Sequence, residues 1–174
     1  DATLVVNRTV TLDLNGHVLK YENSTNRGSV LMVESGGTLT IADSNTAAWH
    51  KFTPDGNGLW VLDESGGTET VAGGVITGGT GKPDDRHGDS GGGVYIGDNA
   101  SLIMNGGSIV GCRVTQGGSP EGGGVYLSAS NAAFTMNDGA HIIGCWSNIY
   151  GGGVGVNYGE FTMNGGSIED CTAG

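Results

Sequence analysis

Residues 122–148 read GGGVYLSASNAAFTMNDGAHIIGCWSN, and close variants of this stretch stand on either side of it. The copies begin at triple glycines that start at residues 91, 122 and 151, so the period is 31 residues and then 29 residues. We define the three repeats as 91–121, 122–150 and 151–174. Periods of this size are typical of stacked modules that share one continuous core.

Each repeat contains three short apolar segments, which in the second repeat are VYL at 125–127, FTM at 134–136 and II at 142–143. Glycine and asparagine pairs interrupt every apolar segment after a few residues, so the segments are too short for helices. In the middle segment apolar and polar residues alternate, which puts the first and third side chains on one face of a strand. Three short strands per repeat predict one coil of a parallel β-helix, in which each strand pairs with its counterpart one coil away.

Stacked coils place like residues on like residues along the axis of a β-helix. We expect one inner column of Leu102, Phe134 and Phe161 and a second inner column of Met104, Met136 and Met163. At the corner that follows, the side-chain amides of Asn105, Asn137 and Asn164 should form a hydrogen-bonded ladder. The repetition has a physical reason, because one coil cannot bury its own apolar side whereas a stack of coils can.

The first half of the chain follows the same pattern more loosely. LDLNG at 12–16 and LTI at 39–41 match the middle strand and its corner, and VIT at 75–77 matches the third strand. We therefore expect an all-β fold of about five coils, with three short strands per coil, in a single domain that spans 1–174. The pattern lapses over 44–69, which we interpret as an irregular insertion, and long insertions in compact domains are often functional. We interpret the whole chain as a piece of a longer protein.

The charge of the chain limits the partners that it can bind. Its 174 residues carry a net charge of −11, with seven basic residues scattered along the sequence. Nucleic acid is excluded as a partner, because binding to it depends on clustered basic side chains that neutralise phosphates. We also expect no membrane insertion of this segment, since no stretch approaches the roughly 20 apolar residues of a membrane span.

The segments LDLNGHVL at 12–19 and SGGTLTIADS at 35–44, followed by the GGGVYI and MNGGSI units of the repeats, resemble a known family. They are similar to the right-handed parallel β-helix repeats of the pectate-lyase-like superfamily, in the versions found in large surface proteins of Gram-positive bacteria. The resemblance covers nearly the whole chain except 44–69. It implies a right-handed coil and an extracellular location, on the bacterial surface or secreted. For activity it implies several alternatives, because the family contains lyases, hydrolases, adhesins and surface repeats.

Three cysteines occupy matching places after the third strand, at Cys112, Cys145 and Cys171. We expect a column of small buried thiols. A disulfide between neighbouring coils is the alternative, since a strand spacing of about 4.8 Å lies within the permitted Cα separation. The chain has no C-x-x-C pair and its histidines lie far apart, so no zinc site is expected, and no cofactor is predicted.

The densest polar cluster consists of Asp84, Asp85 and Asp89 with Arg86 and His87. Lyases of the resembled family use acidic calcium ligands and a basic residue, and its glycosidases use paired carboxylates. The five residues here share one glycine-flanked loop, and the repeats show no acidic column on a strand. We therefore expect a solvated charged loop and no metal or catalytic site.

Aromatic residues are the candidates for ligand binding. They lie in the insertion and on the repeats, at Trp49, His50, Phe52 and Trp60 and at Tyr95, Tyr126, Trp146 and Tyr150. The first group forms either an exposed contact patch for a sugar ring or a protein, or a lid buried against the coil. We expect Tyr95 and Tyr126 to point outward one coil apart, where they could stack on a glycan or simply pair across strands.

The leading functional hypothesis is a non-catalytic binding module of the adhesin type on a bacterial surface. Its partner would be a host glycan, mucin or a host protein such as immunoglobulin. Two alternatives are a carbohydrate-active enzyme, either a lyase or a hydrolase, and a structural spacer without a ligand. The enzyme needs a groove with acids from different coils, the binding module needs ordered exposed aromatic residues, and the spacer needs neither.

Overall fold

The computed structural model describes residues 2–23, 25–83, 88–117, 119 and 121–174. Within these ranges the chain has 21 strands and no helix. Consistent with this, the described residues contain no helix long and apolar enough to cross a membrane.

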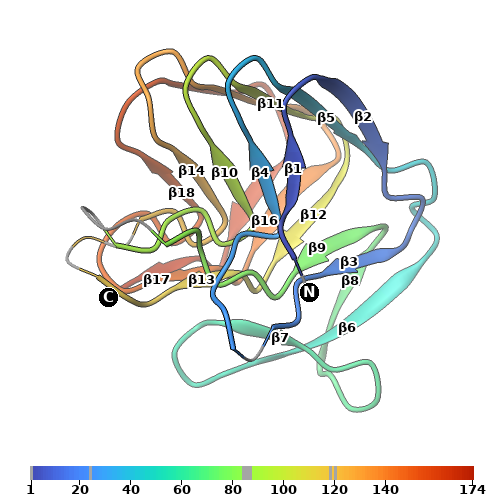
Figure 1. The fold of residues 1–174 in the computed structure, drawn as a ribbon. Helices are drawn as coiled ribbons and strands as arrows, with labels where there is room; N and C mark the ends of the chain where they lie inside the picture. Colours follow the sequence, from blue (N-terminus) through green and yellow to red (C-terminus); the bar gives the residue numbers. More distant parts are fainter. Residues whose placement is uncertain (1, 24, 84–87, 118, 120) are drawn as a thin grey trace.

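Three parallel five-stranded sheets run along the molecule and form its three walls (Figure 1). The first sheet contains, in spatial order, β1 (Leu4–Val6), β4 (Leu31–Val33), β10 (Val94–Ile96), β14 (Val125–Leu127) and β18 (Val154–Val156). The second contains β2 (Thr9–Asp13), β5 (Thr38–Ala42), β11 (Ser101–Met104), β15 (Ala133–Met136) and β19 (Glu160–Met163). The third contains β3 (Val18–Lys20), β9 (Val75–Thr77), β12 (Gly107–Val110), β16 (Ala140–Ile143) and β20 (Ser167–Glu169).

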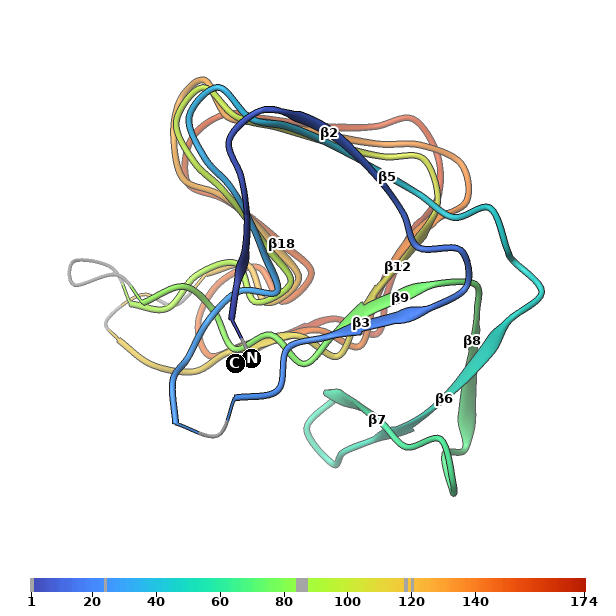
Figure 2. The same ribbon diagram turned by 45° about the vertical axis from the view of Figure 1, so that its right-hand side comes forward.

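Successive coils each contribute one strand to every wall, so the fold is a parallel β-helix of five coils. Seen along the axis in Figure 2, the chain turns clockwise as it recedes from the blue first coil to the red last one, which is the right-handed sense. The prediction of an all-β, right-handed parallel β-helix with about five coils and three strands per coil is confirmed.

The expected side-chain columns form the core. In the second sheet Leu102 lies opposite Phe134, and Phe134 lies opposite Phe161 with the two ring centroids 4.9 Å apart. Met104, Met136 and Met163 continue the adjacent column in register. The corner ladder is also present, since the Nδ2 of Asn137 donates to the Oδ1 of Asn105 at 2.8 Å and that of Asn164 donates to Asn137 at 2.9 Å.

The last three coils carry a short fourth strand in addition to the three predicted ones. β13 (Arg113–Val114), β17 (Trp146–Ser147) and β21 (Thr172–Ala173) form a parallel sheet of their own. The triple glycines pass directly against it: a Cβ on Gly92 would lie 2.9 Å from the backbone nitrogen of Arg113, and one on Gly123 would meet the carbonyl of Trp146. The glycine runs are therefore needed because two backbone layers touch here with no room for side chains.

The stretch interpreted as an irregular insertion is ordered into a small antiparallel sheet. It consists of β6 (Trp49–Pro54) in the middle, with β7 (Trp60–Leu62) and β8 (Glu69–Ala72) on its two sides. Figures 1 and 2 show it outside the coil, beside β3 and β9. Phe52 and Val71 of this sheet form a second core with the outward-facing Val75 and Val110 of the coil wall. The insertion thus covers apolar side chains that the coil alone would expose.

The cysteines form the expected column and are free thiols, with Cys112 and Cys145 buried and Cys171 partly exposed. Cys112 and Cys145 are fully buried, and the Sγ of Cys145 lies 3.8 Å from the carbonyl oxygen of Ile109 one coil away. Burial raises the pKa of the Cys145 thiol well above its ordinary value. A protonated, buried thiol is a poor nucleophile, so the geometry fits a packing role.

Candidate binding groove

The structure distributes the four aromatic candidates of the insertion over different environments. Phe52 is fully buried in the second core, and Trp60 is half-buried with its ring centroid 6.4 Å from that of Phe52. His50 is held on both ring nitrogens, by Glu64 at 2.8 Å and by the carbonyl oxygen of Gly16 at 2.9 Å. Trp49 is 63% exposed. These residues therefore do not form one exposed patch.

The aromatic candidates on the repeats are also separated. Tyr95 and Tyr126 are neighbours with ring centroids 5.8 Å apart, but Tyr126 is buried rather than presented to solvent. The backbone of Gly122 lies close against it, since a Cβ on Gly122 would lie 2.8 Å from the Tyr126 Cβ. Trp146 is half-buried and Tyr150 is exposed.

The Nζ of Lys82 lies 4.5 Å from the centroid of the Tyr95 ring, on which it forms a cation–π contact. A shallow hollow of about 460 Å³ lies beside this pair, between Glu34 and Asp98. The outward aromatic column expected for glycan stacking is therefore reduced to one tyrosine that a lysine already covers.

A groove between the insertion and the coil gathers other residues. Its first part is a cavity of about 190 Å³ between β7 and the turns that follow β9 and β12. Its second part is a wider cavity of about 380 Å³, lined on one side by Asn23, Thr25, Asn26 and Arg27 of the loop that follows β3. Thr80 and Arg113 line both cavities, so the two are neighbours, and we refer to them together as the groove. Its polar and aromatic lining comprises Lys20, Asn23, Thr25, Asn26, Arg27, Trp60, Thr77, Thr80, Arg113, Thr115 and Gln116.

Two glycines at one corner of the coil allow β7, which forms one wall of the groove, to lie directly against the coil. Gly111 and Gly144 occupy equivalent positions after the third strand, both with a left-handed backbone at φ 60° and 54°. A Cβ on Gly111 would collide with the carbonyl of Trp60, and one on Gly144 would collide with the indole ring. The backbone nitrogen of Trp60 donates to the carbonyl oxygen of Gly144 at 2.9 Å, which fixes β7 against the coil.

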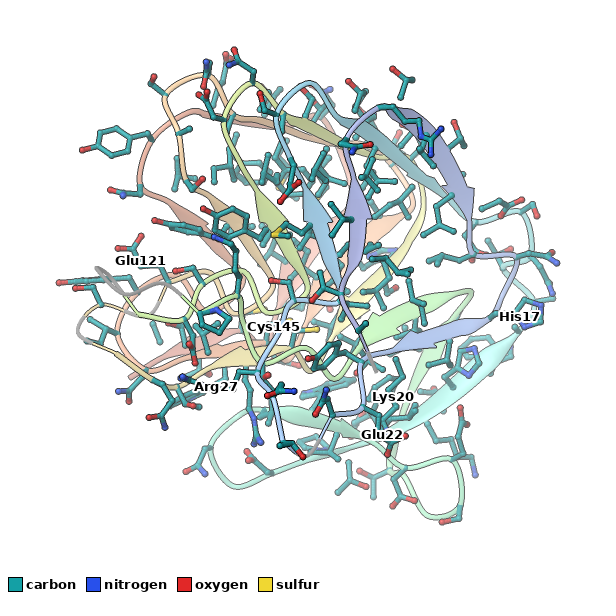
Figure 3. The ribbon with its side chains drawn as sticks, viewed as in Figure 1. His17, Lys20, Glu22, Arg27, Glu121 and Cys145 are labelled. Atoms are coloured by element: carbon teal, nitrogen blue, oxygen red, sulfur yellow. The ribbon has the colours of Figure 1, made fainter. Side chains whose placement is uncertain are left out.

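Three of the seven basic residues of the chain line the groove, although its net charge is −11. Lys20 is exposed and pairs with Glu22 at 3.0 Å (Figure 3). Arg27 is about half exposed and donates from Nη1 to the Oδ2 of Asp89 at 2.7 Å. Within the described parts of the chain the exposed guanidinium of Arg113 has no hydrogen-bond or ion-pair partner. The groove therefore gathers three basic side chains, of which Arg113 is the one without an ion-pair partner among the described residues.

Asp89 holds two lining residues of the groove, Arg27 and Gln116, in place. Its side chain is almost completely buried, its backbone nitrogen bonds to the carbonyl oxygen of Gln116 at 2.8 Å, and its carboxylate holds Arg27. Burial raises the pKa of Asp89, and the neighbouring Arg27 charge opposes this effect. Asp89 is thus a buried structural carboxylate and not part of a solvated loop. The other members of the predicted charged cluster, Asp84, Asp85, Arg86 and His87, lie outside the described residues.

The chemistry of the groove is that of a hydrogen-bond donor surface. The described residues that line it include guanidinium, ammonium, amide and hydroxyl groups and no carboxylate. Among the described residues no group of three or more histidine, cysteine or acidic side chains could hold a metal ion. The arrangement can orient a polar, anionic ligand beside an indole ring.

Sequence reasoning identified Trp60 but missed the basic residues around it. Lys20 and Arg27 lie on β3 and the loop that follows it, but Arg113 stands far from both in the chain, and the three share no motif. One signal was available, since Arg113 directly follows Cys112 at the position where the next repeat has Trp146. Only the stacking of the coils brings these residues to one groove.

No family model matches the chain, and searches of curated proteins and of solved structures find no significant match.

Proposed function

We propose that this chain is a non-catalytic binding module whose groove binds a glycan that carries acidic sugars. The observation that carries the proposal is the convergence of Lys20, Arg27 and Arg113 beside Trp60 in one groove of a strongly acidic chain. A sugar ring offers a C–H face to an indole and hydroxyl groups to amides and threonines. A sugar carboxylate accepts strong, charge-assisted hydrogen bonds from guanidinium groups.

The shape of the groove favours a chain-like ligand. Its two cavities share Thr80 and Arg113, and together their linings reach from β7 to the loop that follows β3. An acidic protein repels other acidic macromolecules at long range, so a local basic groove selects where an anionic ligand approaches. This supports a glycan over an extended protein surface as the partner.

The biological setting of the proposal follows from the family resemblance of the repeats. In that setting the module is displayed outside a bacterial cell and its ligand is a host glycan or mucin. Of the two alternative enzymes, a hydrolase would require paired carboxylates and a lyase of the resembled family would require acidic calcium ligands beside its basic residue. The described lining of the groove offers cationic donors and no carboxylate.

Calorimetric titration with trigalacturonic acid and with neutral galactotriose tests the proposal. We expect binding of the acidic trimer, with affinity that falls as salt rises. Arg113→Met should weaken this binding by about tenfold or more, because it removes charge-assisted hydrogen bonds. Arg8→Met is the matched control, since Arg8 is exposed and does not line the groove.

Three results would overturn the proposal. The first is the absence of binding to either sugar. The second is an equal loss of affinity in the Arg8 and Arg113 variants, which would indicate a general charge effect. The third is the release of unsaturated or reducing ends from the acidic trimer, which would identify the chain as an enzyme.

A further inference from the structure

The two cavities of the groove have linings of different chemistry. The first cavity is bounded on one side by apolar side chains of the insertion, which include Leu59, Trp60 and Leu62. The described residues that line the second cavity are all polar, and amide and guanidinium groups prevail among them. Lys20 lines the first cavity and Arg27 the second, and Figure 3 shows these two residues well apart. A ligand that fills both cavities therefore meets an apolar wall at one end and a hydrogen-bonding wall at the other.

The positive charge that a ligand can use is concentrated at the second cavity. In the first cavity the ammonium of Lys20 is already paired at 3.0 Å with Glu22, which is itself exposed. A sugar carboxylate placed there would stand beside the Glu22 carboxylate and against apolar side chains, and both disfavour its charge. Arg113 lines both cavities and has no ion-pair partner within the described ranges. The second cavity, which Arg27 lines together with Arg113, is therefore the better place for a carboxylate.

The wall of the second cavity is held in shape by internal hydrogen bonds. Arg27 donates from Nη1 to Asp89 at 2.7 Å, and a guanidinium has further N–H donors for a ligand. The Asp89 side chain is 2% exposed, so its carboxylate is shielded from the groove. In the loop that follows β3, the Oδ1 of Asn23 accepts the backbone N–H groups of Thr25 and Asn26 at 3.0 and 2.8 Å. A wall that is already ordered loses little conformational freedom when a ligand binds.

We infer that the ligand is a mixed glycan, with a neutral sugar in the first cavity and an acidic sugar beside it in the second. The neutral ring lies with its C–H face against Trp60, and the carboxylate of the acidic sugar accepts hydrogen bonds from Arg27 and Arg113. This inference rests on the proposed function and adds the order of the sugars in the groove. A glycan in which neutral and acidic sugars alternate matches both cavities, whereas a wholly acidic glycan places a carboxylate against the apolar wall.

Calorimetric titration with three tetrasaccharides tests this order. The first alternates glucuronic acid and N-acetylglucosamine, the second contains galacturonic acid alone, and the third contains N-acetylglucosamine alone. We expect the alternating tetrasaccharide to bind about tenfold more tightly than the acidic one, although it carries fewer carboxylates, and the neutral one to bind most weakly. If the acidic tetrasaccharide bound as tightly as the alternating one, the inference would be overturned and the proposed function would stand. If neither bound, both would be overturned.

A substitution at Val61 should change this preference. The Val61 side chain lines the first cavity and is 49% exposed. Val61→Lys adds an ammonium there, so affinity for the acidic tetrasaccharide should rise about tenfold and the preference for the alternating one should disappear. Val5→Lys is the matched control, since Val5 is 50% exposed on β1 and lines neither cavity. An unchanged preference in Val61→Lys, or an equal gain in the two variants, would overturn the inference.

Saturation-transfer NMR in D2O locates the sugars in the parent protein without any substitution. The first cavity presents the carbon-bound protons of Trp60, Leu59 and Leu62, whereas the donor protons of the second cavity exchange with deuterium. The strongest saturation should therefore reach the ring protons of N-acetylglucosamine in the alternating tetrasaccharide. Stronger saturation of the glucuronic acid protons would show that the acidic sugar lies against the apolar wall, and this would overturn the inference.

Discussion

Replacement of Phe52 by alanine tests whether the insertion is a structural lid on the coil. Phe52 is fully buried and packs with Val71 of its own sheet and with Val75 and Val110 of the coil wall. The removal of a buried phenylalanine side chain costs about 3–5 kcal/mol, part of it from lost transfer energy and part from the cavity left behind. A domain of ordinary stability has only about 5–15 kcal/mol to lose. We therefore expect the Phe52→Ala protein to be folded but much less stable.

Trp49→Ala is the matched control for this variant. Trp49 stands on the same strand three residues earlier, and it is the more bulky residue, but its side chain is largely exposed. Its removal should change the free energy of unfolding by less than about 0.5 kcal/mol. If the insertion did not pack against the coil, the two substitutions would have similarly small effects on the free energy of unfolding.

Urea denaturation followed by far-UV circular dichroism measures the two free energies, and hydrogen exchange locates the loss. In Phe52→Ala the amides of β6, β7 and β8 should lose protection first, because the insertion can detach before the coil unfolds. The amides of the second wall should keep theirs. A Phe52→Ala protein as stable as the parent, or a Trp49→Ala protein as destabilised as Phe52→Ala, would refute the reasoning.

Three further predictions concern the coil. Ile109→Asp places an unpaired charge in the centre of the core at a cost of several kcal/mol, so soluble folded protein should be lost on expression, and a variant that melts like the parent would show that the register is different. Substitution of all three cysteines by alanine should lower stability by a few kcal/mol at most and keep sugar binding, and intact mass spectrometry of the parent should find free thiols rather than a homogeneous disulfide. The pKa of Asp89 is raised in the folded state by burial, so its contribution to stability is fully present below the ordinary value of 3.8 and is lost as pH rises through the folded-state pKa. Urea titrations should therefore show that the parent loses stability relative to Asp89→Asn as pH rises from 3.8 through the folded-state pKa of Asp89. A difference between the two proteins that stays constant with pH would contradict a raised pKa of Asp89.

The coils could be predicted from the sequence because each coil repeats the same pattern of residues. Phe134 and Phe161, or Asn137 and Asn164, stand at matching places in consecutive repeats, so their stacking follows once the period is known. The insertion contains no repeat, and its strands pair in antiparallel fashion over loops of different length. Its apolar alternation is also weak, since only Phe52 and Val71 of its residues in β6 and β8 are fully buried. An isolated stretch of this kind gives no signal that distinguishes a sheet from a loop.

The groove could not be predicted because its residues come from separate levels of the structure. Lys20 belongs to the first coil, Thr80 to the second and Arg113 to the third, while Trp60 belongs to the insertion. Their proximity depends on the rise of the helix and on where the insertion docks. The aromatic candidates of the insertion are close in the chain, whereas the groove residues are close along the axis of the coil.

The docking position of the insertion is itself encoded in the coil, at the corner that follows the third strand. Gly78, Gly111, Gly144 and Asp170 occupy equivalent positions in the second to fifth coils, and all four have a left-handed backbone. Asp170 adopts φ 51°, so the turn alone does not require glycine. Glycine is required where another backbone or an indole ring lies against the corner, as Trp60 does at positions 111 and 144. Glycine at 111 and 144 therefore permits β7 to lie against the third and fourth coils, and this contact places one wall of the groove.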